Sequence, residues 1–85
     1  MKTRMKNTPV EQFQEGGIYS GLGVLIAEGD ANIEISGHQL QDDGFYKHSV
    51  YISENVEGAE QFEVAQFDTY TASAEYVIYL ANEVG

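Results

Sequence analysis

The 85-residue chain contains no cysteine, so neither a disulfide nor a cysteine-based zinc site can stabilise it. A chain of this length buries only about 60–65% of the surface that it exposes when unfolded, and its stability must come from an apolar core. Apolar residues make up 42% of the sequence, which is enough for a core and too many for a disordered acidic tail. The sequence predicts a single domain in a reducing compartment such as the cytoplasm.

Charged residues are distributed unevenly along the chain. Three of the four basic residues, Lys2, Arg4 and Lys6, lie at its beginning. Residues 7–85 contain all 14 acidic residues and one basic residue, Lys47. Their formal charge is therefore −13, and the net charge of the whole chain is −10. Phosphate groups are repelled by such a field, so nucleic acid and anionic membranes are poor partners and a basic protein surface is the natural one. The alternative is that the acidity only confers solubility.

Residues 1–8 are predicted to be a basic flexible arm, and residues 9–85 a single acidic domain. No apolar segment follows the arm, so it does not have the pattern of a secretory signal. The sequence Thr8–Glu11 (TPVE) has the pattern of a helix start, with Thr8 as N-cap and a capping box. The glycine pair at 16–17 would end this helix after one to two turns.

The most apolar run, Ile18–Ala27, is predicted to be the first strand of a sheet. Isoleucine, tyrosine and valine favour strands, and two glycines inside the run suggest a bulge. A buried helix is the alternative, in which the two glycines would cost about 2 kcal/mol. Glu28–Asp30 (EGD) is then predicted to be a hairpin turn.

Three further segments have the pattern of strands. Asn32–Ser36 alternates between polar and apolar residues, so its two isoleucines should face the core. Asp42–Gly44 has the Asp-Gly signal of a turn and is followed by a third strand, Phe45–Ile52. Phe62–Phe67 is predicted to be the fourth strand, with a helix over residues 56–66 as the alternative.

Near the end of the chain, Thr71 is predicted to cap a helix over residues 72–83. Its apolar residues recur at i, i+3, i+4 and i+7, which places them on one face. These residues are Ala74, Val77, Ile78 and Ala81. The sequence therefore predicts an α+β domain, in which an antiparallel sheet of about four strands is covered on one face by a short N-terminal helix and a C-terminal helix.

Residues that could carry catalysis or bind a metal are few. His38 and His48 flank Asp42 and Asp43, but a hairpin alone would bring these four together. The serines lie in no G-x-S-x-G turn, and the glycine-rich segment 16–21 lacks the lysine of a phosphate-binding loop. The sequence thus predicts a binding protein rather than an enzyme, with no catalytic residue, metal site or cofactor.

Carboxylates are the strongest binding candidates. Alternate residues of a strand lie about 6.6 Å apart, close to the phosphate spacing along a nucleic-acid strand, so a row of acids can occupy a basic groove. One row is predicted at residues 28–34 and another at residues 54–63. The acidic candidates are Glu28, Asp30, Glu34, Asp42, Asp43, Glu54, Glu57, Glu60 and Glu63. The alternative is a solvated acidic rim.

Aromatic residues are numerous, with six tyrosines and four phenylalanines. Tyrosine is enriched in interfaces because it brings apolar area at a low entropy cost. Tyr51 is predicted to bind the partner together with the acids, and Tyr70, Tyr76 and Tyr79 are further candidates for a contact surface. The alternative for these side chains is packing in the core and at its rim.

In size, in acidity, in the lack of cysteine and in its α+β order, the chain resembles the small inhibitors of bacterial defence that phages and plasmids encode. These are the anti-CRISPR and antirestriction proteins, several of which mimic nucleic acid. No motif carries the resemblance. It implies a stoichiometric inhibitor, acting in the cytoplasm of the host bacterium, whose acidic surface blocks a basic groove on a nuclease or ribonucleoprotein effector.

Two other functions remain open from the sequence. An acidic immunity protein or antitoxin would use carboxylates and tyrosines against the basic site of a cognate toxin. A structural or assembly protein would instead self-associate, as a homodimer or larger oligomer, through the open face of its sheet.

Overall fold

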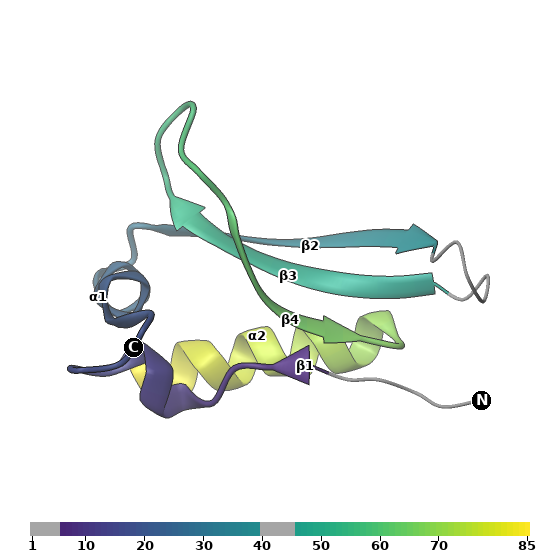
Figure 1. Cartoon of the computed structure of the whole chain (residues 1–85), viewed down its shortest axis with the longest axis horizontal. Coiled ribbons are helices and arrows are strands. Elements are labelled where there is room, and N and C mark those ends of the chain that lie inside the picture. Colours follow the sequence, from purple (N-terminus) through teal and green to yellow (C-terminus); the bar gives the residue numbers. More distant parts are fainter. Residues whose placement is uncertain (1–5, 40–45) are drawn as a thin grey trace.

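The computed structural model describes residues 6–39 and 46–85. The predicted α+β class is confirmed, with a helical layer against an antiparallel sheet (Figure 1). The elements are β1 (Lys6–Asn7), the 3₁₀ helix η1 (Val10–Phe13), α1 (Ser20–Glu28), β2 (Ala31–Gln39), β3 (Tyr46–Glu54), β4 (Phe62–Phe67) and α2 (Tyr70–Val84).

The sheet consists of three long strands and the two-residue β1, in the order β1-β4-β3-β2 (Figure 1). The predicted strands at 32–36, 45–52 and 62–67 correspond to β2, β3 and β4, and the helix alternative over 56–66 is wrong. β2 and β3 pair without interruption, whereas Val64 is an extra residue in β4 that forms a bulge opposite β3. The turn predicted at Asp42–Gly44 lies outside the described residues.

The predicted first strand, Ile18–Ala27, is wrong, because most of this run is the helix α1. Gly23 explains the outcome: it is buried, and a Cβ there would lie 1.8 Å from the backbone oxygen of Phe13. The glycine therefore lets η1 pack directly on α1, and this packing offsets its low helix propensity. Glu28–Asp30 is not a hairpin turn, since Gly29 has φ 79° and forms the left-handed C-cap of α1.

The N-terminal helix is shorter than predicted, because only the 3₁₀ turn η1 forms, with Pro9 as its N-cap. Thr8 does not cap it. Instead, the amide nitrogen of Thr8 donates to the oxygen of Val64 over 3.1 Å and the hydroxyl donates to the same oxygen over 2.6 Å. Together with the pairing of β1 with β4, these bonds attach residues 6–8 of the predicted arm to the sheet.

The C-terminal helix is confirmed, but it begins earlier and is rotated relative to the prediction. Thr69, not Thr71, is the N-cap, and its hydroxyl accepts from the amide of Ala72. The buried residues are Ser73, Tyr76 and Leu80, whereas Ile78 is 60% exposed. Burying a tyrosine and a leucine removes more apolar surface from water than burying the two alanines of the predicted face.

The core lies between this helical layer and one face of the sheet. Side chains from every element except the two-residue β1 and the edge strand β2 are buried in it. Its buried residues are Val10, Phe13, Ile26, Val50, Ile52, Val64, Ala65, Phe67, Tyr76 and Leu80. Ile33 and Ile35 of β2 pack against this core as predicted, but they stay partly exposed because β2 is an edge strand.

The two glycines of α1 provide a matched test of this packing. Gly23→Ala should lower the free energy of unfolding by about 1–3 kcal/mol, because the added methyl group meets the backbone of Phe13. Gly21→Ala should raise it by up to about 1 kcal/mol, because a Cβ there meets nothing within 4 Å and alanine favours the helix. Urea unfolding followed by circular dichroism measures both. Equal effects of the two substitutions would contradict the proposed contact between η1 and α1.

Candidate protein-binding surface

Six of the predicted acidic residues gather at one end of the molecule, where α1 ends, β2 begins and the β3–β4 connection lies (Figure 1). We call these residues the acidic end. They are Glu28, Asp30, Glu34, Glu54, Glu57 and Glu60, and all six are exposed. Asp42 and Asp43 lie outside the described residues.

Backbone pairing brings the acidic end together. Ala31 pairs with Glu54 across β2 and β3, and the amide of Asn55 donates to the oxygen of Asp30 over 3.1 Å. Across β3, the side-chain amide of Gln61, which precedes β4, donates to a carboxylate oxygen of Glu34 on β2 over 2.6 Å. Figure 1 shows the β3–β4 connection extending beyond the end of β3 and then turning back into β4.

The predicted regular rows of acids are not formed. Glu28 belongs to a helix, so it does not continue the spacing of Glu34 on β2. Glu54 ends β3 and Glu57 lies in the connection, while Glu63 is on β4 and half-buried. The acids therefore form an irregular cluster around one end of the fold, and its members come from five different segments.

Glu63 takes part in a polar network on the face of the sheet that the helices do not cover. Its carboxylate accepts hydrogen bonds from the hydroxyl of Ser49 over 2.9 Å and from the side-chain amide of Gln66 over 3.3 Å. Tyr51 lies opposite Glu63 in the ladder and is half-buried. Both predicted binding residues are thus engaged in the sheet, and neither belongs to the acidic end.

The described acids have almost no basic neighbours. Ten of the twelve described acidic residues are exposed. Lys47 is the one lysine or arginine whose side chain the structure describes, and it is 5% exposed and forms a salt bridge with Asp68. This buried cation cannot offset the field at the acidic end, so the field there stays strongly negative.

An apolar groove adjoins the acidic end between α1 and the β3–β4 connection. Two adjoining hollows of about 440 and 360 Å³ share Gly21, Leu22 and Phe62. Ile18, at the outer end, is 83% exposed, and Phe62 is 40% exposed. The residues that line the two hollows are Ile18, Tyr19, Gly21, Leu22, Leu25, Glu54, Ala59, Glu60 and Phe62.

The groove has the composition of a protein interface, because an apolar centre is bordered by the charged residues Glu54 and Glu60. Sequence reasoning missed it. The run that contains Ile18 and Leu22 is predicted to lie in the sheet, and Phe62 is predicted only as the start of a strand. An apolar helix pattern with more apolar residues than one face can bury was the signal that could have revealed it.

The tyrosines divide between core and surface. Tyr70 is 60% and Tyr79 is 47% exposed, so these two remain candidates for a contact surface. Tyr76 was predicted as one and is buried: its hydroxyl donates to the oxygen of Thr8 over 2.6 Å, and its ring packs against Phe67. The ring fills the space between α2 and the start of the sheet, which the helical pattern alone did not reveal.

The two histidines do not meet. His48 lies on the helix side of the sheet, between the rings of Tyr46 and Tyr70, whereas His38 pairs with Lys47 and shares its face. Within residues 6–39 and 46–85, no group of three or more histidine, aspartate and glutamate side chains could hold a metal ion.

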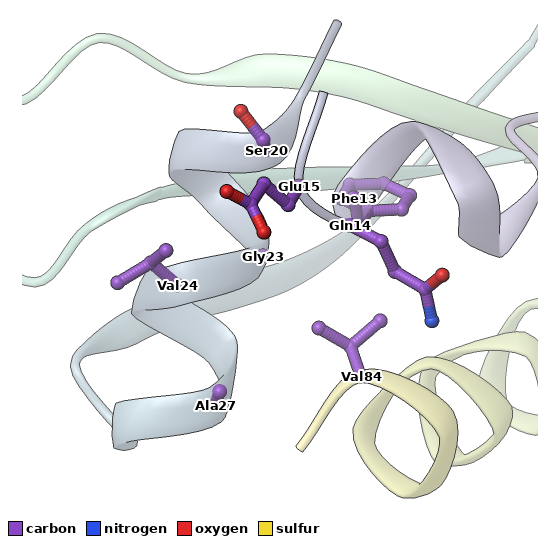
Figure 2. Close-up of a pocket in the computed structure, with 8 residues that line it drawn as sticks. All are labelled: Phe13, Gln14, Glu15, Ser20, Gly23, Val24, Ala27 and Val84. Atoms are coloured by element: carbon purple, nitrogen blue, oxygen red, sulfur yellow. The ribbon is translucent and has the colours of Figure 1, made fainter. Parts of the chain in front are cut away.

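A third hollow, of about 510 Å³, lies between η1, α1 and the end of α2 (Figure 2). Figure 2 shows Phe13 and Gln14 on one side, Val24 and Ala27 on α1, and Val84 on α2. Glu15 is the one ionisable residue that lines it. A single exposed carboxylate has no partner for acid–base catalysis here.

Comparison with protein-family models, curated proteins and solved structures finds no match to this chain. No helix within residues 6–39 and 46–85 is long and apolar enough to cross a membrane.

The hydrogen bond of Tyr76 can be tested by Tyr76→Phe. This variant keeps the packed ring and loses the bond to Thr8, so the free energy of unfolding should fall by about 1 kcal/mol. Thermal and urea unfolding measure the change. Tyr79→Phe is the control, because the Tyr79 side chain is half-exposed and should be tolerated. An unchanged stability of Tyr76→Phe would contradict the role of this bond.

The stability of the protein at alkaline pH provides a second test of the Tyr76 hydroxyl. Burial raises the pKa of Tyr76 from 10.0 to about 12, so the folded state binds this proton more tightly than the unfolded state. The resulting stabilisation is complete below pH 10 and is lost as the pH rises towards 12. The difference in stability between the wild type and Tyr76→Phe should therefore shrink over that interval in unfolding curves recorded at each pH. A constant difference would contradict the raised pKa.

Proposed function

We propose that this protein is a stoichiometric inhibitor that binds a basic, nucleic-acid-handling protein, such as a defence nuclease or a CRISPR effector, in the cytoplasm of a bacterial host. The observation that carries the proposal is the acidic end: six exposed carboxylates, next to an apolar groove, without a described basic side chain at the surface.

The arrangement favours a partner with a defined chemistry. Electrostatic attraction between the acidic end and lysine or arginine side chains would speed association and orient the two proteins. An apolar or aromatic side chain of the partner would enter the groove beside Leu22 and Phe62 and supply most of the affinity. Basic surfaces that bind nucleic acid present the required cations.

The acids suit a basic patch better than they suit a linear phosphate track. They come from separate segments and follow no constant spacing, so a strict copy of a nucleic-acid strand is not what they provide. We therefore expect competition with nucleic acid to arise from occupation of the same basic surface, through an interface that also contains apolar contacts.

Charge reversal tests the proposal. The triple variant Glu54→Lys, Glu57→Lys and Glu60→Lys should bind the partner at least ~10-fold more weakly, because it places cations opposite cations. The matched control reverses Glu11, Glu75 and Glu83, which are also exposed but lie outside the acidic end. Both variants have the same net charge, so only the position of the changes differs.

The measurement is capture from a bacterial lysate on the immobilised protein, with washes at low and then high salt. Proteins released by salt are identified, and their nuclease activity is assayed with the inhibitor at equimolar concentration. We expect a basic nuclease or ribonucleoprotein that the wild type and the control inhibit and the triple variant does not. Equal capture and inhibition by the two triple variants would refute a role for the acidic end.

A further inference from the structure

β2 is an open edge of the sheet. It lies at the end of the strand order, nine residues long, and its register with β3 has no shift (Figure 1). Its sequence, ANIEISGHQ, contains no proline and no lysine, and Glu34 is its one acid. Soluble proteins usually protect such an edge with charges, prolines or bulges, because unpaired backbone groups there can pair with another chain.

The register identifies which backbone groups the edge presents. Asp30 and Asn55 are the next opposed pair beyond Ala31 and Glu54. The backbone amide of Asn55 donates to the backbone oxygen of Asp30. In an antiparallel ladder, the backbone N–H and C=O groups of successive residues point alternately towards the neighbouring strand and away from it. The backbone groups of the even-numbered residues of β2 therefore bond to β3, and those of the odd-numbered residues point outwards. No other described residue donates to or accepts from the backbone of these odd-numbered residues. The outward groups belong to Ala31, Ile33, Ile35, Gly37 and Gln39.

These outward groups are self-complementary. We propose that the protein forms a homodimer in which the β2 strands of two copies pair antiparallel about a two-fold axis at Ile35. Ile33 of one copy would then bond with Gly37 of the other, and Ala31 with Gln39, so that every outward group of the strand is paired. This inference does not rest on the proposed function.

The register centred on Ile35 also suits the side chains. It places Glu34 opposite Ser36 of the second copy and keeps the two Glu34 residues from facing each other. A register centred on Glu34 would place like charges opposite each other. Because odd-numbered side chains lie on the helix side, Ile35 would contact its own copy across the axis and bury surface that is exposed in the monomer.

A strand pair by itself is marginal in water, and α2 supplies the additional apolar surface. Tyr76 bonds to Thr8, so its side of α2 faces β1 and β4, and Tyr70 contacts His48 on the opposite side. Helical geometry places Ala74, Val77 and Ala81 on the Tyr70 side, towards β2, with Ile78 next to them on the solvent side of the helix. Ala74 and Val77 are half-buried, whereas Ala81 is exposed and Ile78 is 60% exposed, so the monomer covers this apolar flank only in part.

The antiparallel arrangement separates the charges that would oppose association. Apart from Glu34, which would lie diagonally across from its copy, the acids of each acidic end lie before or beside the start of β2, so these two groups would lie at opposite ends of the joined strands, about 30 Å apart. This separation exceeds the Debye length of about 8 Å at physiological ionic strength. The remaining repulsion between two chains of net charge −10 is screened by salt, so salt should strengthen the dimer.

Sedimentation equilibrium tests the proposal over a range of protein and salt concentrations. We expect a species of twice the 9.4 kDa chain mass, whose dissociation constant falls as salt is raised. Ile78→Glu should weaken the dimer at least ~10-fold, by placing a charge in the apolar flank. Val24→Glu, at a 54% exposed position of α1, is the matched control and should leave the dissociation constant unchanged.

Gly37→Pro tests the backbone pairing independently. Its amide points outwards, so proline should spare the β2–β3 ladder and remove two symmetry-related bonds of the dimer, one from each copy. The ring of His48, which a Cβ would approach to 3.3 Å, can move aside. Circular dichroism verifies that each variant is folded. A monomer at every concentration and salt, or a dimer that survives both Ile78→Glu and Gly37→Pro, overturns the proposal.

Hydrogen exchange of the backbone amides tests which residues of β2 pair with the second copy. Even-numbered amides of β2 should be protected at all protein concentrations, and odd-numbered amides should become protected only as the dimer forms. Protection of odd-numbered amides that appears only when a different protein is added would assign the edge to that partner and overturn the homodimer. Dissociation of the dimer by salt would do the same, because it would indicate an interface held by charge.

Discussion

The fold depends on one small apolar cluster between α2 and the central strands. Val50, Ile52, Val64 and Leu80 are fully buried in it, and the chain has no disulfide to assist them. The side chains of β3 project from both faces of the sheet. Val50 and Ile52 lie in the core, while Ser49 and Lys47 form polar contacts on the other face. Because the cluster is small, the 3₁₀ turn η1 has to contribute Val10 and Phe13 to it, and hydrogen bonds of Thr8 hold the preceding segment on the sheet.

The limited size of this core explains the surfaces that remain. α1 and α2 each have more apolar residues than the sheet can cover, so Val24 of α1 and Ile78 of α2 are exposed, as is Ile18 just before α1. The flank at α1 adjoins the acidic end, and the flank at α2 adjoins the open edge of β2. We infer from this that the first surface serves a basic partner and the second a copy of the same chain, with opposite dependences on salt.

Patterns with an unambiguous period were predicted correctly. Alternation over Asn32–Ser36 placed the two isoleucines of β2 on the core side, and the i, i+3, i+4 pattern located α2. Ile18–Ala27 was assigned to the wrong type of element, because a short apolar run fits a strand or a helix. The helix propensity of glycine argued against a helix, but the packing of Gly23 on Phe13 could not be foreseen from the run itself. Among the site residues, the acids at the surface were predicted, but their arrangement in rows was not confirmed, and the apolar groove was missed.

The sequence by itself determined the class of the fold, the strands β2 to β4 and the excess of acid over base, because these follow from local periodicity and from counting charges. Only the tertiary structure decided that Gly23 is a contact point between η1 and α1, that Tyr76 rather than Ile78 is buried, and that the acids collect at one end. The physical reason is that each of these depends on contacts between segments far apart in the chain, such as the 68-residue separation between Thr8 and Tyr76. No local pattern specifies such contacts.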